Sequence, residues 1–286
     1  MLSARTNHAS NIGNMKKKVD RGQGTGDSSK KSHAVRVLVF AGYGLNCEEE
    51  TAYAFTLAGA HADIVHINDV IDGRVKLKNY HILAFPGGFA YGDDTGAGKA
   101  YGNRVKNHLE EELEKFIGDR KLIIGICNGQ QILSQMGLLP GAFVYNSNNR
   151  YTDRWVDMAV EGDSPWLSGI QTLSCPIAHG EGRFVAPEKE LAELKRNKRV
   201  ALRYVKGETS RYQNLPANPN GSMENIAGVL SHEGRVFGLM PHPDRAFLTM
   251  HRPDWPLLKE KAKRTGEKLP KYTSTLQVFK NGVEFF

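Results

Sequence analysis

A cysteine between two glycines is the clearest candidate for chemistry in this sequence. In GICNG, Gly125 to Gly129, a run of β-forming residues reaches Cys127 and a helical pattern begins directly after it. This G-x-C-x-G spacing is the nucleophile-elbow pattern, with sulfur in place of the serine oxygen. Small neighbours allow the strained turn, and a helix N-terminus favours the thiolate over the thiol. The pattern therefore predicts that Cys127 is a nucleophile at the carboxyl edge of a sheet.

The two other cysteines fit this role less well. Cys47 also precedes a helical pattern, but it follows the longer loop GYGLN rather than a tight elbow. We predict a structural or pocket-wall role for Cys47, and a place in the core for Cys175, which lies inside the strand-like TLSCPIAH. A buried structural thiol is the alternative for Cys127 itself. Three cysteines cannot form a disulfide framework and are typical of a reducing, cytoplasmic compartment.

A base and a group that orients it follow late in the chain, in GLMPHPDRAF. His242 and Asp244 are two residues apart, and in an extended chain such residues point the same way, about 6.6–6.8 Å apart. The carboxylate can then hold one imidazole nitrogen while the other faces the thiol, so we predict a Cys127–His242–Asp244 triad. A metal site is the competing interpretation, but His-x-Asp alone is a weak ligand set. An ordinary loop histidine is the other alternative.

A glycine pair can complete the site. The strand-like stretch before it ends in Phe85-Pro-Gly-Gly88, and the loop FAYGDDTGAG follows. We predict that the backbone N–H groups of Gly88 and Asn128 form an oxyanion hole. Because the loop lacks the Lys-Ser/Thr pair of a P-loop, phosphate binding is the weaker alternative. Asp93 and Asp94 are expected to structure the loop rather than to bind a metal.

These residues need a particular set of elements around them. Strand-like segments alternate with helical patterns in the first half of the folded chain, at 34–40, 48–60, 61–67, 80–88, 103–117, 122–126 and 129–136. This alternation predicts an α/β fold with a flavodoxin-like, doubly wound, mostly parallel sheet. The second half adds β-structure at 154–160, 172–179, 199–205 and 225–240, with a hairpin turn at His232-Glu233-Gly234. Residues 275–286 fit a helix or a strand. We predict one domain over 34–286.

The positive charge lies mostly outside that domain. The formal net charge is +7, yet residues 1–34 alone hold seven Lys and Arg against two Asp. The domain shows no basic–aromatic stripe, so we predict no nucleic-acid partner. No apolar stretch approaches the length of a membrane span, so no membrane role is expected. Residues 1–33 are predicted to be a disordered basic tail, with a transit peptide or a true start at Met15 as alternatives.

Taken in order, PGG, G-x-C-x-G and a late His-Pro-acid resemble the class I glutamine amidotransferases. Further motifs are similar to the family of amidotransferase subunits of phosphoribosylformylglycinamidine synthase, a ligase of purine synthesis. They are Asn46-Cys47-Glu48, GGFAYGDDTGAGK, GICNGQQIL, PIAHGEGRF, NPNGS and MPHPDRAF. The resemblance runs from about Val35 to the last residue.

The resemblance implies a reaction. Cys127 would attack the side-chain amide of glutamine, His242 would protonate the departing ammonia, and water would hydrolyse the thioester. Ammonia would pass to a separate synthetase subunit that uses ATP and Mg²⁺, with a third small subunit possible and no cofactor or metal in this chain. Within the motifs we place further substrate-pocket candidates at Asn46, Gly87, Phe89, Tyr91, Gln131 and His179.

Two departures from the family pattern stand out. The family has His-Pro-Glu where this chain has His242-Pro243-Asp244, one methylene shorter, and the chain is long beyond MPHPDRAF. One alternative is a class I amidotransferase that serves another synthetase. A non-catalytic regulatory subunit is another, favoured only by Asp244. A stand-alone cysteine hydrolase is a third, against which HGEGRF argues.

Overall fold

The computed structural model describes residues 34–93, 95–211 and 214–286. The predicted tail 1–33 and the predicted loop-structuring role of Asp94 lie outside the described residues. Residues 34–286 form one compact unit, and the helices and strands below all belong to it.

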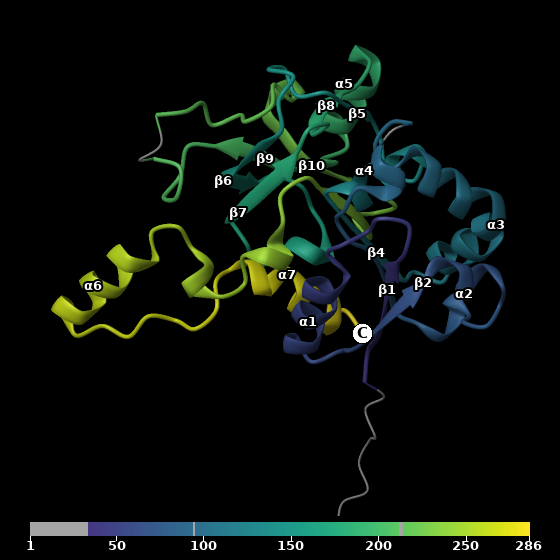
Figure 1. The fold of residues 1–286 in the computed structure, drawn as a ribbon, viewed down its shortest axis with the longest axis horizontal. Helices are drawn as coiled ribbons and strands as arrows, with labels where there is room; N and C mark the ends of the chain where they lie inside the picture. The colour runs from purple at the N-terminus through teal and green to yellow at the C-terminus, as the bar shows by residue number, and fades with distance from the viewer. Residues whose placement is uncertain (1–33, 94, 212–213) are drawn as a thin grey trace, which may run out of the picture. The chain divides into compact units, whose positions relative to one another are not determined.

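A nine-stranded mixed sheet runs through this unit (Figure 1). Its strands in chain order are β1 (Arg36–Ala41), β2 (His61–His66), β3 (Ile82–Phe85), β4 (Leu122–Ile126), β6 (Thr152–Val160), β7 (Thr172–His179), β9 (Val200–Val205), β10 (Ile226–Ser231) and β11 (Val236–Leu239). They lie in the order β2-β1-β3-β4-β11-β10-β9-β6-β7. Pairs from β2 to β11 are parallel, whereas pairs from β11 to β7 are antiparallel. The predicted fold class, with extra β-structure in the C-terminal half, is confirmed.

Two further strands form a separate antiparallel pair, β5 (Ala142–Val144) with β8 (Arg183–Val185). The α-helices are α1 (Glu48–Leu57), α2 (Ile67–Ile71), α3 (Lys99–Gly118), α4 (Asn128–Gln135), α5 (Glu188–Arg196), α6 (Trp255–Thr265) and α7 (Thr275–Glu284). Short 3-10 helices are η1 (Leu77–Asn79), η2 (Ala90–Asp93), η3 (Pro165–Leu167), η4 (Met223–Asn225), η5 (Pro243–Arg245) and η6 (Thr249–His251).

Helices cover both faces of the parallel part of the sheet. Successive residues of a strand point to opposite faces, so the inner parallel strands β3 and β4 are apolar along their whole length, whereas the edge strand β2 carries His61, Asp63 and His66. Val39 of β1 packs in one core with Phe55 of α1 and Phe279 of α7. Its neighbour Phe40 packs in the other core with residues of α3 and α4, including Leu133. The doubly wound arrangement follows from these two cores.

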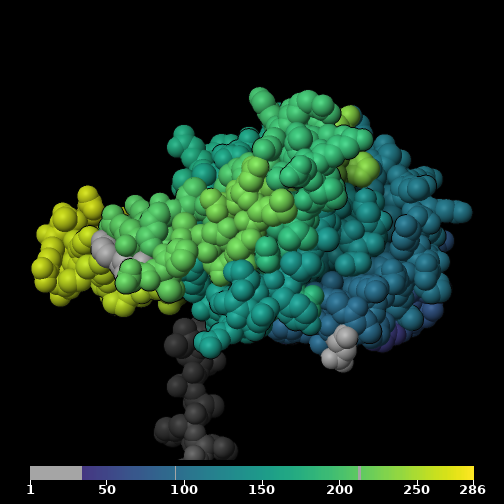
Figure 2. Space-filling model, turned by 90° about the horizontal axis from the view of Figure 1, so that it is seen from above, coloured from purple at the N-terminus to yellow at the C-terminus, as the bar shows by residue number. Residues whose placement is uncertain are grey.

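The C-terminal segment contains one element whose type the sequence left undecided and one that we did not predict. Residues 275–284 are the helix α7, and its Leu276 and Phe279 are buried three residues apart on one face. The helix α6 stands out from the surface (yellow in Figure 2), and only Ala262 of its residues is buried. We predicted no element over these residues, although Trp255, Leu258 and Ala262 have helical spacing.

No helix among the described residues is both long enough and apolar enough to cross a membrane.

Candidate active site

Cys127 occupies a tight turn between β4 and α4. Its φ of 51° and ψ of −109° lie in a region that non-glycine residues rarely adopt, and such a conformation costs about 1–3 kcal/mol. Its backbone N–H donates to Leu239 O at 2.8 Å, which fastens the turn to β11. The predicted elbow is therefore present, and its thiol lies at the carboxyl end of the parallel strands.

The glycines on both sides of the elbow are required by close packing. A Cβ at Gly129 would lie 1.8 Å from Phe85 O, because the first turn of α4 lies directly on the end of β3. A Cβ at Gly125 would lie 2.6 Å from Leu133 Cδ1 and 2.7 Å from Gly129 O. No larger side chain fits at either position without moving backbone atoms.

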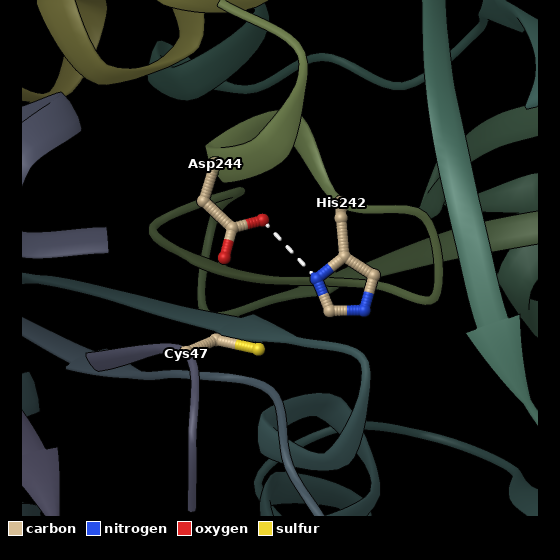
Figure 3. Close-up of side chains that lie close together, drawn as sticks. All are labelled: Cys47, His242 and Asp244. Carbon is tan, nitrogen blue, oxygen red and sulfur yellow. Dashed lines mark hydrogen bonds and ion pairs between the residues drawn. The ribbon is translucent and has the colours of Figure 1, made fainter. Parts of the chain in front are cut away.

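His242 and Asp244 form a buried pair (Figure 3). His242 Nδ1 lies 3.2 Å from Asp244 Oδ1, and the second carboxylate oxygen accepts a hydrogen bond from Thr51 Oγ1 of α1 at 3.2 Å. Both residues are almost inaccessible to solvent, at 2% and 0% exposure. An ion pair removed from water in this way holds one geometry, so Asp244 fixes which imidazole nitrogen turns away from it.

The backbone route to this pair differs from the predicted one. We expected an extended chain that points residues 242 and 244 the same way. Instead His242 precedes the 3-10 helix η5, which begins at Pro243 and carries Asp244 back over the imidazole. The turn shortens the path between the two side chains. Asp244 therefore reaches His242 although it is one methylene shorter than the glutamate of the family pattern.

The charge state of His242 depends on its partners. Burial alone would lower the pKa of His242, but the Asp244 carboxylate and the Cys127 thiol outweigh burial and hold this pKa well above its usual value. The imidazole thus interacts with both other members of the predicted triad. The structure brings all three together, with the thiol also 3.8 Å from Ala178 O.

The glycine pair lies beside the elbow as predicted. Gly87 O accepts hydrogen bonds from the N–H groups of Asn46 and Cys47, at 3.1 and 3.2 Å, which holds the loop against the start of α1. Within the described chain, neither Gly88 N–H nor Asn128 N–H donates to another residue. Both donors are therefore free for a developing negative charge.

The Asn128 side chain serves the loop rather than the pocket. Its Oδ1 accepts from Ala90 N at 3.0 Å, and its Nδ2 donates to Gln131 Oε1 at 2.8 Å and to Asp93 Oδ1 at 3.3 Å. These bonds tie the loop after β3 to the first turn of α4. Asp93 thus structures the loop, in agreement with its predicted role.

The remaining pocket candidates divide by exposure. Phe89 is 40% exposed and its ring lies 6.1 Å from that of Tyr151, whereas Tyr91 stacks on Tyr43 at 4.9 Å. Asn46 is exposed as well, and its Oδ1 accepts from the Cys47 thiol at 3.3 Å. These side chains lie on the surface of the loops around the site, and nothing places them against Cys127.

Gln131 and His179 are buried and belong to the wall of the site. Gln131 Nε2 donates to Glu181 O at 2.6 Å, which joins α4 to the HGEGRF loop. His179 Nδ1 lies 3.1 Å from Asn146 Oδ1, and its Nε2 has no hydrogen-bond partner in the described chain. Burial, with a smaller effect of the charge on His242, lowers the pKa of His179 to about 4. His179 is therefore neutral near pH 7.

Several contributors were missed from the sequence. Thr51 reaches Asp244 across 193 residues of chain, and no local motif announces that contact. Burial raises the pKa of Tyr151, and the nearby Cys127 raises it further. Arg245 donates from Nη2 to Cys47 Sγ at 2.8 Å. The sequence signal for Arg245 was its position directly after Asp244.

Cys47, His242 and Asp244 also have the spacing of metal ligands, since one ligand atom of each lies within 4.8 Å of the others (Figure 3). Other bonds already engage these atoms. Asp244 is paired with His242 and Thr51, and the Arg245 cation contacts the Cys47 sulfur. A cation bound here would meet that guanidinium and would break the His242–Asp244 pair. The arrangement suits a nucleophile, a base and an oxyanion hole better than a metal centre.

Comparison with known proteins agrees with this chemistry. A family model described as a CobB/CobQ-like glutamine amidotransferase domain matches residues 34–286. A relative from Methanococcus maripaludis, named phosphoribosylformylglycinamidine synthase subunit PurQ, is 49% identical over 265 residues, which cover 88% of this chain and 97% of the relative. A relative of the same name from Dehalococcoides mccartyi is 38% identical, over 85% of this chain and 97% of its own. A chain of the solved structure of PurLQS from Thermotoga maritima is similar with a TM-score of 0.67 and 32% identity, covering 88% and 99% of the two chains.

Proposed function

This chain belongs to the family of CobB/CobQ-like glutamine amidotransferase domains, and from that membership we propose that it is the glutamine-hydrolysing subunit of a phosphoribosylformylglycinamidine synthase. The observation that carries the proposal is the elbow thiol of Cys127 beside the buried His242–Asp244 pair. The short Asp244 had favoured a regulatory subunit without activity. Its contact with His242 removes that reason.

The reaction uses groups of this chain alone. Cys127 Sγ attacks the side-chain amide carbon of glutamine, and the N–H groups of Gly88 and Asn128 stabilise the negative oxygen of the tetrahedral intermediate. The carbon–nitrogen bond breaks as the His242 imidazolium gives a proton to the departing nitrogen, which leaves as ammonia. A γ-glutamyl thioester remains on the sulfur.

Hydrolysis of the thioester closes the cycle. His242, now neutral, takes a proton from water, and the resulting hydroxide attacks the thioester carbon. The carbon–sulfur bond breaks, glutamate leaves, and the Cys127 thiolate and His242 imidazolium are restored. Asp244 stabilises the imidazolium in both halves. One glutamine and one water give one glutamate and one ammonia.

The ammonia formed by this chain is used by a partner subunit. A synthetase subunit uses it, with ATP and Mg²⁺ bound in that subunit, to convert formylglycinamide ribonucleotide to formylglycinamidine ribonucleotide. The similarity to a chain of the PurLQS complex supports such a partner and a third small subunit. The chemistry assigned to this chain requires no cofactor or metal. Free thiols at Cys47, Cys127 and Cys175 support a cytoplasmic location.

Access to the site supports control by the partner. Cys127 is 5% exposed and His242 is 2% exposed, so little of either group is open to solvent in the isolated chain. We expect the isolated chain to hydrolyse glutamine slowly and the complex to hydrolyse it faster. Equal rates with and without the synthetase and its substrates would contradict this control.

The proposal is tested with Cys127→Ala in the assembled synthase. Synthesis from glutamine should fall at least a thousandfold, to the limit of detection, while synthesis from added ammonia should stay within twofold of wild type. The matched control is Cys175→Ala, an equally buried cysteine in β7 that should keep both activities. Normal glutamine use by Cys127→Ala would overturn the nucleophile assignment. A wild-type chain that forms no active complex with a synthetase would overturn the function itself.

A further inference from the structure

Cys47 is a buried cysteine beside the active site that the reaction does not use. It is 1% exposed and forms the N-cap of α1. Burial raises its pKa, and this effect exceeds the lowering influence of His242 and Arg245. Burial therefore favours the neutral thiol over the thiolate, and the contacts of this sulfur need an explanation other than nucleophilic attack.

The sulfur of Cys47 lies beside the imidazole of His242 and beside Gly87, the residue before the oxyanion donor Gly88. Figure 3 shows the sulfur pointing toward the ring, and one ligand atom each of Cys47, His242 and Asp244 lies within 4.8 Å of the others. A Cβ added at Gly87 would lie 2.6 Å from His242 Cε1 and 2.9 Å from Cys47 Sγ. Gly87 thus lies against both the ring edge and the sulfur, which leave no room for a side-chain atom at position 87.

The sulfur is itself held from two sides. Arg245 Nη2 donates to Sγ at 2.8 Å, and the thiol donates to Asn46 Oδ1 at 3.3 Å. Arg245 is fixed in turn by Glu50 Oε1, which accepts from its Nε at 3.0 Å. The first turn of α1 and the turn η5 are therefore clamped together, with Cys47 at the point of contact with the imidazole.

We propose that Cys47 is a positioning residue for catalysis. Its sulfur, held by Arg245, supports the Cε1–Nδ1 edge of His242 and keeps the ring in the plane that joins Asp244 to Cys127. Without this support one hydrogen bond to Asp244 would restrain the ring, and rotation of the ring would misalign Nε2 with the thiol. The same residue donates its N–H to Gly87 O, so it also fixes the ring relative to the oxyanion donors. This inference rests on the proposed glutaminase function.

The test compares Cys47→Ala, Cys47→Ser and Cys175→Ala in the assembled synthase. For Cys47→Ala we expect kcat with glutamine to fall about tenfold to a hundredfold, since small misplacements of a catalytic group have effects of that size. KM for glutamine and synthesis from ammonia should stay within twofold of wild type. The serine variant keeps an acceptor for Arg245 and should recover at least half of the lost kcat on a logarithmic scale.

A second readout separates positioning from a loss of packing. The rate at which iodoacetamide alkylates Cys127, followed by mass spectrometry of the peptide, reports how well His242 activates the thiol. This alkylation rate should fall at least fivefold in Cys47→Ala and remain unchanged in Cys175→Ala. The Cys175→Ala variant also removes a buried sulfur and should lower the melting temperature.

The outcomes distinguish the inference from the function on which it rests. If Cys127→Ala abolishes glutamine use while Cys47→Ala keeps wild-type kcat and alkylation rate, only the positioning role is wrong. If Cys47→Ala and Cys175→Ala lose kcat equally, the effect is one of packing and the inference also fails. A Cys47→Ala chain too unstable to assay leaves the decision to Cys47→Ser and Cys47→Val. The valine variant fills the space without a bond to Arg245, and it should be slower than the serine variant.

Discussion

Replacing Asp244 by Asn removes one charge and changes little else. The carboxylate has a ring nitrogen of His242 at one oxygen and the Thr51 hydroxyl at the other, each at 3.2 Å. An asparagine can keep both contacts, with its oxygen toward His242 Nδ1 and its NH₂ toward the hydroxyl of Thr51. Asp244 is fully buried, so solvent cannot replace the lost charge. The substitution therefore isolates the stabilisation of the imidazolium.

The size of the effect follows from that lost charge. A hydrogen bond to a charged group contributes about 1.5–3 kcal/mol and a neutral one about 0.5–1.5 kcal/mol, so a variant that keeps the bond without the charge loses about 1–1.5 kcal/mol. Each 1.36 kcal/mol in the barrier is tenfold in rate, so we expect glutamine-dependent kcat of Asp244→Asn to fall about 5-fold to 13-fold. Thiolates are strong nucleophiles, so the loss should be smaller than for Cys127→Ala.

The assay follows synthesis from glutamine and from ammonia in the same complex preparation. Asp244→Glu restores the charge and should retain activity. Thr51→Val removes the hydrogen bond that the hydroxyl donates to the carboxylate but keeps the charge beside His242, so it should lose less kcat than Asp244→Asn. A glutamine-dependent kcat of Asp244→Asn within twofold of wild type would refute the reasoning, because His242 would then be oriented by another group or by none.

Two further predictions concern stability. Gly129→Ala should leave the chain largely unfolded on expression, because its Cβ would overlap Phe85 O. The control is Gly118→Ala at the end of α3, where no atom of the described chain outside this helix lies within 4 Å of the added Cβ. This variant should unfold at the same or a slightly higher temperature in a thermal melt. The pKa of His179 is lowered to about 4 in the fold, so on acidification the histidine of the unfolded chain binds a proton before that of the folded chain. The free energy of unfolding therefore falls as pH drops from 6.5 to 4, by about 3 kcal/mol for this group. His179→Gln should lose less stability than wild type over that interval in urea titrations, and equal losses would show that His179 is not held neutral.

The sequence predicted those parts of the site that neighbouring residues determine. The elbow at Cys127 could be found because its strand, its turn and its helix start all lie within a dozen residues. The pairing of His242 with Asp244 was predicted, but on the wrong backbone geometry, since a proline in the pattern fits both an extended chain and a 3-10 turn. Contacts of Thr51 and Cys47 with the catalytic pair depend on where α1 packs, and periodicity within a helix does not report that.

Prediction of the helices and strands was limited in the same way, because some of them depend on packing partners that are distant in the sequence. Buried strands such as β4 are apolar throughout, and their type was predicted correctly. Residues 275–286 were ambiguous because a short apolar segment fits a helix or a strand until its packing partner is known. The helix α6 was missed although Trp255, Leu258 and Ala262 have helical spacing, since this short pattern lies in a segment rich in Lys and Arg.

The place of β11 in the sheet has a consequence for the newly made chain. This strand lies between β4 and β10, it accepts the N–H of Cys127 at Leu239, and it leads directly into His242. The thiol leaves the ribosome about 115 residues before its base, which is about 6 to 23 s of synthesis at 5–20 residues per second. During that interval β4 is an uncovered apolar edge strand, and the nucleophile lacks the imidazole that activates it. Glutamine hydrolysis therefore cannot begin on a chain that ends before His242, and until β11 pairs with β4 this edge of the sheet is open to pairing with other chains.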